Sequence, residues 1–180
     1  MKIKNFLGKI VLVSLALALV AIAGSAASQS VTTYQDKEGK YEFTLPQNWQ
    51  AVNYQDGTGH DRVDIVYRDR SYGLLKITQE SLSDHADLDS FIHNEIDQNL
   101  RFRPGYVYNS TERFVGQYMS GQLLQFDFTH AGQPKKARNY YLKSNNLTVW
   151  VLRFAGNRDV FSPLRHETDA IARSFKPIAK

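Results

Sequence analysis

Four side chains that can bind a hard cation lie close together in the first half of the chain. They are Asp56, His60, Asp61 and Asp64, in a stretch that also holds two glycines. Carboxylate oxygens are the ligands that cations such as Ca²⁺ prefer. Asp and Gly are also typical of a tight turn between two strands. The sequence therefore leaves two interpretations open, a divalent-cation site and an ordinary polar hairpin turn.

Two further histidines, His85 and His93, lie at the start of a segment with helical periodicity. A zinc-binding helix places two His residues four positions apart with a third ligand nearby, whereas these two are eight apart. The neighbouring acids Asp84, Asp87 and Asp89 are in the place where side chains cap a helix N-terminus. We therefore keep binding of calcium, manganese or zinc as an alternative to capping, and we expect no other cofactor.

Patterns that mark an enzyme active site are missing from the sequence. There is no Gly-x-Ser-x-Gly elbow and no glycine-rich phosphate loop. The absence of Cys excludes thiol nucleophiles, thiolate metal sites and disulfides. His130 ends an apolar strand face, and we expect it to be a hydrogen-bonded core residue rather than an acid–base group. We predict no catalytic residue, and a hydrolase whose triad no motif marks is the third interpretation.

Basic residues gather at two places along the chain. These are Arg101 and Arg103 on either side of Phe102, and Lys135 and Lys136 with Arg138. We expect solvated charges at the ends of secondary-structure elements, with contact to an anionic surface as the alternative. The formal net charge of the chain is +4, and three of its lysines lie in the first nine residues. The remaining chain is therefore close to neutral. Nucleic-acid binding is therefore not expected.

The first 26 residues have the three parts of a secretory signal peptide. Lys2, Lys4 and Lys9 precede an apolar run over 10–23, and small residues follow it. We predict cleavage near Ala26, with an uncleaved N-terminal anchor as the alternative. The protein is then exported to the periplasm or the extracellular space without a stable membrane anchor. Residues 27–38 are expected to be a flexible mature N-terminus, and 39–178 a single domain, more often a monomer than an oligomer at this size.

The body of the chain alternates between polar and apolar residues, as half-buried strands do. Strands are predicted over residues 41–45, 49–54, 63–67, 72–79, 106–115, 122–130, 138–143 and 147–154. Two helices are predicted, one over 87–100 and one that starts at Ser162-Pro163 after a break at Gly156-Asn157. The strand over 147–154 is apolar on both faces, which indicates a central position. The fold class is α+β, with an antiparallel sheet of six to eight strands, a mid-chain helix and a C-terminal helix.

The domain also resembles a known family. Its first strand reads Tyr41-x-Phe43-x-x-Pro46-x-x-Trp49, and its last helix ends in Ser174-Phe175-Lys176-Pro177. This is similar to the PsbP-like fold family over most of residues 39–178. The resemblance implies an α/β/α sandwich with helices on both faces of the sheet. It also implies a non-enzymatic protein that binds a protein partner. Some photosynthetic members bind calcium or manganese, but no ligand motif matches here, and the lipidated Cys of the cyanobacterial pattern is absent.

These observations favour one function over two others. The first hypothesis is a non-catalytic, exported interaction module, an accessory or assembly factor of an envelope or membrane-associated complex. The second is a small-ligand or metal-ion binding protein that uses the turn at Asp56–Asp64 or the helix edge at His85 and His93. The third is the hydrolase without a motif.

Overall fold

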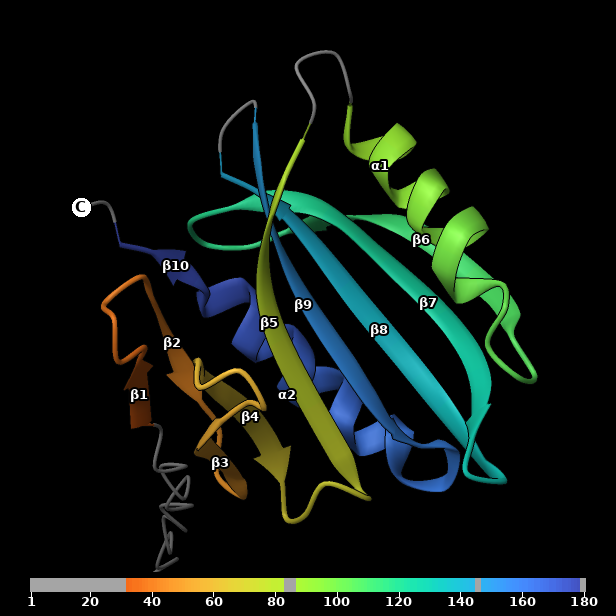
Figure 1. The fold of residues 1–180 in the computed structure, drawn as a ribbon, viewed down its shortest axis with the longest axis horizontal. Coiled ribbons are helices and arrows are strands. Elements are labelled where there is room, and N and C mark those ends of the chain that lie inside the picture. Colours follow the sequence, from red (N-terminus) through yellow and green to blue (C-terminus); the bar gives the residue numbers. More distant parts are fainter. Residues whose placement is uncertain (1–31, 83–86, 145–146, 179–180) are drawn as a thin grey trace, which may run out of the picture.

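A computed structural model describes residues 32–82, 87–144 and 147–178. The chain forms a large antiparallel sheet, a small sheet and two α-helices (Figure 1). The predicted α+β class is confirmed. The elements of the large sheet are β3 (Trp49–Gln55), β4 (Asp61–Tyr67), β5 (Gly73–Ser81), β6 (Val107–Val115), β7 (Ser120–His130), β8 (Gln133–Lys143) and β9 (Thr148–Asn157).

The large sheet has seven strands in the order β3-β4-β5-β9-β8-β7-β6, and every neighbouring pair is antiparallel. β9 is therefore the middle strand. Val149 and Val151 on one of its faces and Leu152 on the other are all fully buried. This confirms the central position predicted from its two apolar faces. The predicted break at Gly156-Asn157 is wrong, because both residues still pair with β8.

One face of the sheet is covered by α1 (Leu88–Glu95), which continues into a π-helical turn, η1 (Ile96–Leu100). Asp87 is the N-cap, and its side chain accepts a hydrogen bond from the backbone N–H of Ser90 at 2.7 Å. The predicted capping role is thus confirmed for Asp87. The apolar side of the helix packs on a cluster that includes Ile92, Leu100 and Phe126.

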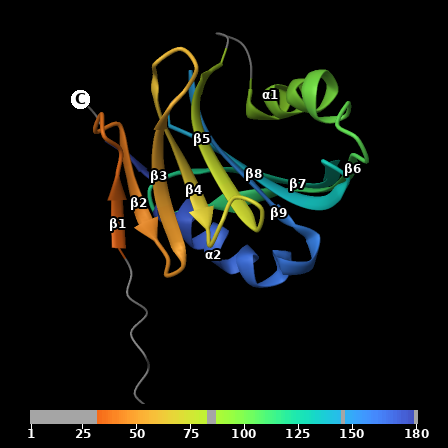
Figure 2. The same cartoon turned by 60° about the horizontal axis from the view of Figure 1, so that its bottom comes forward.

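The opposite face is covered by α2 (Phe161–Ser174), and Figure 2 shows the sheet between the two helices. The α/β/α sandwich is therefore present. The helix begins one residue before Ser162, close to the predicted start, but the predicted capping role of Ser162 is wrong. A short 3₁₀ turn, η2 (Arg158–Val160), leads directly into the helix, and Val160 is its N-cap without a side-chain hydrogen bond. Leu164, Ile171 and Ala172 form the buried side of α2.

A separate three-stranded sheet closes one side of the molecule. It has the order β1-β2-β10 and consists of β1 (Thr32–Gln35), β2 (Tyr41–Leu45) and β10 (Lys176–Pro177). The expectation of a flexible segment over 27–38 is corrected for Thr32–Gln35, which pair with β2. Residues 27–31 and the predicted signal peptide lie outside the described residues.

Aromatic rings join the small sheet to the large one. The ring centroid of Phe175, at the end of α2, lies 5.3 Å from the ring centroid of Tyr41 of β2 and 5.3 Å from that of Trp150 of β9. Phe43 lies next to Phe175 at 6.4 Å and is 1% exposed. The motif that starts at Tyr41 therefore supplies core rings, which is the structural role expected from its alternation.

Within the described residues, no helix is long and apolar enough to cross a bilayer.

Candidate functional site

The turn between β3 and β4 is held together by the carboxylate of Asp56. Its Oδ1 accepts hydrogen bonds from the backbone N–H groups of Thr58 and His60 at 2.9 and 3.0 Å, and Oδ2 accepts one from Arg62 at 2.9 Å. The side-chain hydrogen bond from Thr58 contributes most to holding the pKa of Asp56 well below its ordinary value. The predicted polar turn is therefore present, and its central carboxylate is engaged by the turn itself.

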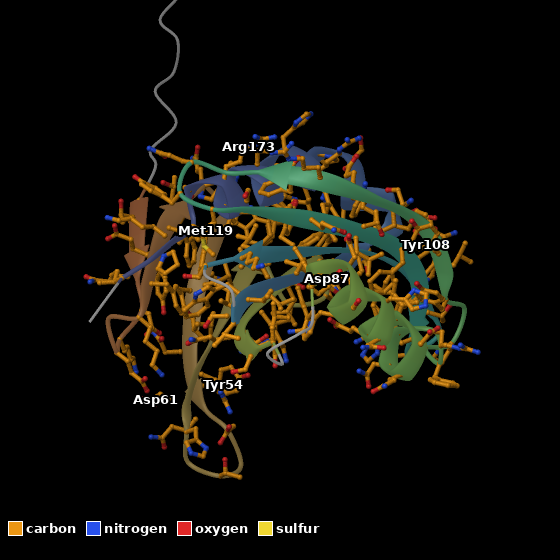
Figure 3. The ribbon with its side chains drawn as sticks, turned by 90° about the horizontal axis from the view of Figure 1, so that it is seen from above. Tyr54, Asp61, Asp87, Tyr108, Met119 and Arg173 are labelled. Carbon is orange, nitrogen blue, oxygen red and sulfur yellow. The ribbon has the colours of Figure 1, made fainter. Side chains whose placement is uncertain are left out.

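The other candidate cation ligands do not join Asp56. Asp64 is buried on β4, where its Oδ2 accepts a hydrogen bond from Arg70 at 2.8 Å. Asp61 is exposed at the end of the hairpin, which extends away from the body (Figure 3). His93 is exposed on α1 and is 3.2 Å from Asp97, while His85 lies outside the described residues. Over the described ranges, no three His, Cys, Asp or Glu side chains are arranged to hold a metal ion.

Two expectations about charged residues are corrected by the structure. His130 is exposed at the end of β7 rather than part of the core. Arg138 was expected to be solvated, but its side chain is only 1% exposed. It donates hydrogen bonds to Gln125, Tyr140 and Asp169, which lie on β7, β8 and α2. Burial is the main reason why the pKa of Tyr140 is raised.

A second internal polar cluster lies on the α1 side of the sheet. Glu95, at the end of α1, accepts a hydrogen bond from the Nε of Arg153 at 3.2 Å, and its side chain is 10% exposed. Arg153 also donates to Thr78 of β5. Burial, followed by the charge of Glu95, raises the pKa of Tyr141. Each helix is thus joined to the sheet by one arginine. The Oε2 of Glu95 is buried and has no hydrogen-bond partner within the described residues.

A shallow groove runs between α1 and the outer strands β7 and β6. It consists of two adjoining hollows of about 430 and 370 Å³, both lined by Thr111 of β6 and Gln122 of β7. Gln122 donates a hydrogen bond across the groove to Asp89 of α1. The second hollow has an apolar lining. It is formed by Ile92 and Ile96 on the helix side and by Tyr106 and Tyr108 on the strand side.

Tyr106 lines the groove and packs its ring against Phe126 at a centroid distance of 5.4 Å. Its hydroxyl is buried and makes no hydrogen bond within the described part of the chain. Burial is the main cause that raises the pKa of this hydroxyl. A buried hydroxyl without a partner is unfavourable by roughly 1 to 3 kcal/mol. The hydroxyl oxygen is closed off from solvent, so a molecule in the groove would contact other atoms of Tyr106.

The outer strand β6 forms the open side of this groove. It pairs only with β7, so one edge of its backbone has no neighbouring strand in the described sheet. Tyr108, 52% exposed, lies next to a bulge between Tyr108 and Ser110. Figure 3 shows Tyr108 on this outer side of the sheet, near α1. Tyrosine combines a large apolar surface with a polar end, which suits a contact surface.

Sequence reasoning did not find this groove. The tyrosines Tyr106 and Tyr108 were assigned to a strand, and Ile92 and Ile96 to the apolar face of a helix, but nothing indicated that the two elements leave a gap. The one available signal is the exposed tyrosine on a strand whose neighbouring residues Asn109 to Arg113 are polar. That pattern is typical of an edge strand.

Comparisons with known proteins show similarity in fold alone. No protein-family model matches the chain, and no curated protein is significantly similar to it in sequence. Among solved structures, LpqN of Mycobacterium tuberculosis, a protein involved in cell envelope biogenesis, is similar with a TM-score of 0.60 and 12% identity. The similarity covers 84% of this chain and 92% of LpqN.

Two further structures have the same architecture. The cyanobacterial PsbP of Synechocystis has a TM-score of 0.56 at 14% identity, over 88% of this chain and 99% of that one. The Ran-binding protein Mog1p of Saccharomyces cerevisiae has a TM-score of 0.56 at 10% identity, over 83% and 96%. The sheet order, the two covering helices and these three similarities together show that the chain has the PsbP-like fold.

Proposed function

We propose that this chain is a non-catalytic, exported interaction module that serves as an accessory factor of an envelope or membrane-associated complex. In this proposal an extended segment of a partner protein lies along β6, with its side chains in the groove between α1 and β6. The observation that carries the proposal is an apolar groove, lined by Ile96 and Tyr108, beside a free strand edge.

Three physical features support a peptide as the occupant. An extended chain added to β6 would pair with backbone groups at the free edge, which supplies affinity without a specific sequence. Its inward side chains would meet the apolar surfaces of Tyr108 and Ile96, which supplies specificity. The groove is open and shallow, which suits a strand better than a small compact ligand.

The fold neighbours are consistent with this function. LpqN is involved in cell envelope biogenesis and Mog1p is a Ran-binding protein. Neither description names a catalytic activity. The guanidinium groups of Arg138 and Arg153 are engaged by hydrogen bonds within the protein, so the proposal places the partner at the groove rather than at these clusters.

Site-specific photo-cross-linking in intact cells tests the proposal. A photoreactive phenylalanine analogue replaces Tyr108 in one variant and Tyr118 in a control, because both tyrosines are 52% exposed but only Tyr108 lines the groove. We expect a discrete cross-linked product from position 108 and none from position 118.

A blocking substitution makes this test specific. Thr111→Trp should fill the groove and remove the product at position 108, since Thr111 lines both hollows. Thr33→Trp, on the exposed edge strand β1, should leave the product unchanged. Equal products from positions 108 and 118, or a product that survives Thr111→Trp in a folded protein, would rule out the groove as the binding site.

A further inference from the structure

The most exposed large apolar side chain in the described residues is Phe102. It is 72% exposed, at the turn Arg101–Gly105 that connects η1 to β6. The guanidinium of Arg101 lies 5.5 Å from its ring centroid. Phe102 therefore contributes little to the core, and its position calls for another explanation than packing.

The backbone holds this turn in a defined shape. The N–H of Arg103 donates to the carbonyl of Leu100 at 3.0 Å, and that of Thr129 donates to the carbonyl of Pro104 at 2.6 Å. Gly105 has φ +64°, and a Cβ there would lie 2.7 Å from the hydroxyl of Thr129. The turn is thus fixed against the end of β7, and it presents Phe102 outward in one orientation.

Two arginines lie beside Phe102 in the turn. The guanidinium of Arg101 is 5.5 Å from the ring of Phe102, and that of Arg103 is 5.2 Å from the ring of Phe128. Lys136 lies over Phe161 of α2, on the other face of the sheet. Asp97 is paired with Arg101 and His93, and Asp127 with Lys136 and Arg158, while Asp159 has no ion pair within the described residues. Of the two arginines in the turn, Arg101 is thus paired with an acid, whereas Arg103 has no ion pair within the described residues.

We infer that the Arg101–Gly105 turn is a contact point for an anionic lipid surface. The ring of Phe102 would enter the region between the lipid headgroups and the acyl chains, and the guanidinium groups of Arg101 and Arg103 would bind headgroup phosphates. Tyr108, also exposed, lies on the strand that leaves the turn, and tyrosine favours the membrane interface.

The shape of the turn favours a bilayer over a protein partner. A single convex turn offers far less contact area than the roughly 800 Å² per partner of a stable protein interface. A fluid bilayer, in contrast, closes around a small apolar protrusion, and arginines beside it reach the phosphates through their flexible stems. The contact is weak by itself, as one side chain is too small to anchor a protein.

Tryptophan fluorescence can test this inference at the level of one residue. The chain has two tryptophans, and Trp49 and Trp150 are only 5% and 6% exposed. A Phe102→Trp variant therefore adds an exposed reporter. With vesicles that contain phosphatidylglycerol, we expect a blue shift of its emission and quenching by brominated acyl chains. Vesicles of phosphatidylcholine alone should give a much smaller shift.

A matched control separates this contact from general binding. The predicted leader of the full chain could itself bind vesicles, so a second reporter, Tyr118→Trp, is placed at a side chain that is 52% exposed elsewhere. Its emission should not shift. In the Phe102→Trp background, changing Arg101 and Arg103 to Gln should weaken the response to anionic vesicles about thirtyfold, since each basic residue near such a surface contributes about 1 kcal/mol.

Three results would overturn the inference. They are an unshifted emission from position 102 with anionic vesicles, an equal shift at position 118, and a response at position 102 that does not depend on the two arginines. A protein partner at the turn would appear as protection of position 102 in cell extract freed of membranes, without any response to vesicles. That result would equally exclude the lipid contact.

Discussion

The guanidinium of Arg138 on β8 is ion-paired with Asp169 on α2, although its side chain is only 1% exposed to solvent. Asp169 is 21% exposed, so the pair lies at the boundary between the core and the surface. Tyr140 and Gln125 accept hydrogen bonds from its Nε and Nη1. Each of the three guanidinium nitrogens thus has an acceptor, which helps a buried arginine to be tolerated.

Removing Asp169 should destabilise the protein more than removing both partners. Asp169→Ala leaves the buried charge of Arg138 without its counter-ion, and we expect the free energy of unfolding to fall by about 2 to 3 kcal/mol, less than for a fully buried pair. The double variant Arg138→Met with Asp169→Ala should recover part of that loss. Urea unfolding followed by tryptophan fluorescence measures both, and equal losses would contradict this account.

Acid should loosen the β3–β4 turn before it unfolds the domain. Hydrogen bonds from Thr58 and Arg62 hold the folded-state pKa of Asp56 below its ordinary value of 3.8. Their contribution is therefore complete above that value and is lost as the pH falls through the lowered pKa. Amide hydrogen exchange should show falling protection of the Thr58 and His60 N–H groups at acidic pH.

The matched variants for this test differ in one carboxylate. Asp56→Asn should reduce the protection of the same amides already at neutral pH and remove its dependence on acid. Asp61→Asn, at an exposed position of the same hairpin, should behave like the unmodified protein. Protection that is insensitive to acid in the unmodified protein would show that the carboxylate does not order the turn.

Gly121 on β7 should not accept any side chain. A Cβ at this position would clash with the backbone carbonyl of Tyr141 on β8. We expect Gly121→Ala to lower the free energy of unfolding by about 3 kcal/mol, because a backbone atom in a central sheet has little room to shift. Gly57→Ala is the control, since no atom lies within 4 Å of its Cβ position, and it should change stability by less than about 0.5 kcal/mol.

Two phenylalanines should differ strongly in their effect on stability. Phe175 is fully buried where the two sheets meet, and Phe175→Ala should cost about 3 to 5 kcal/mol. Phe102→Ala should change stability by less than about 0.5 kcal/mol, because this ring is 72% exposed. Thermal unfolding measures both. A large loss in Phe102→Ala would indicate a structural role and weaken the case for a surface contact.

The strands and the first helix could be predicted because their patterns record which side chains are buried. Val149 to Phe154 alternate between two apolar faces, and β9 is the central strand that this pattern requires. The helix face of Leu88, Phe91 and Ile92 packs where its 3.6-residue period places it. Such patterns are local, so they can be recognised in the sequence without knowledge of the rest of the fold.

The buried charges could not be predicted because their partners are distant in the sequence. Arg138 follows two lysines in the sequence, so it was predicted to be a surface charge like them. Its partner Asp169 lies on α2 and reaches Arg138 only because that helix packs on the sheet. The one local signal was that Arg138 shares a strand face with Tyr140 and Leu142, both fully buried. The same limit applies to Ser162. Its residue type is typical of a helix N-cap, but the 3₁₀ turn η2 leads directly into α2 before it.

The candidate site was predicted less well than the fold. The turn at Asp56 was correctly predicted as a polar turn, and binding of a cation there stays a prediction. The groove arises from a gap between α1 and β6, and its width depends on how η1 and the Arg101–Gly105 turn separate those elements. No periodicity within either element encodes that distance.

The position of β9 also determines when the protein can acquire its structure. β9 is formed by residues 148–157, and β3, β4 and β5 reach the rest of the large sheet only through it. A ribosome therefore completes the first half of the chain long before the strand on which that half must assemble. Early completion of the large sheet is thus prevented by the order of synthesis.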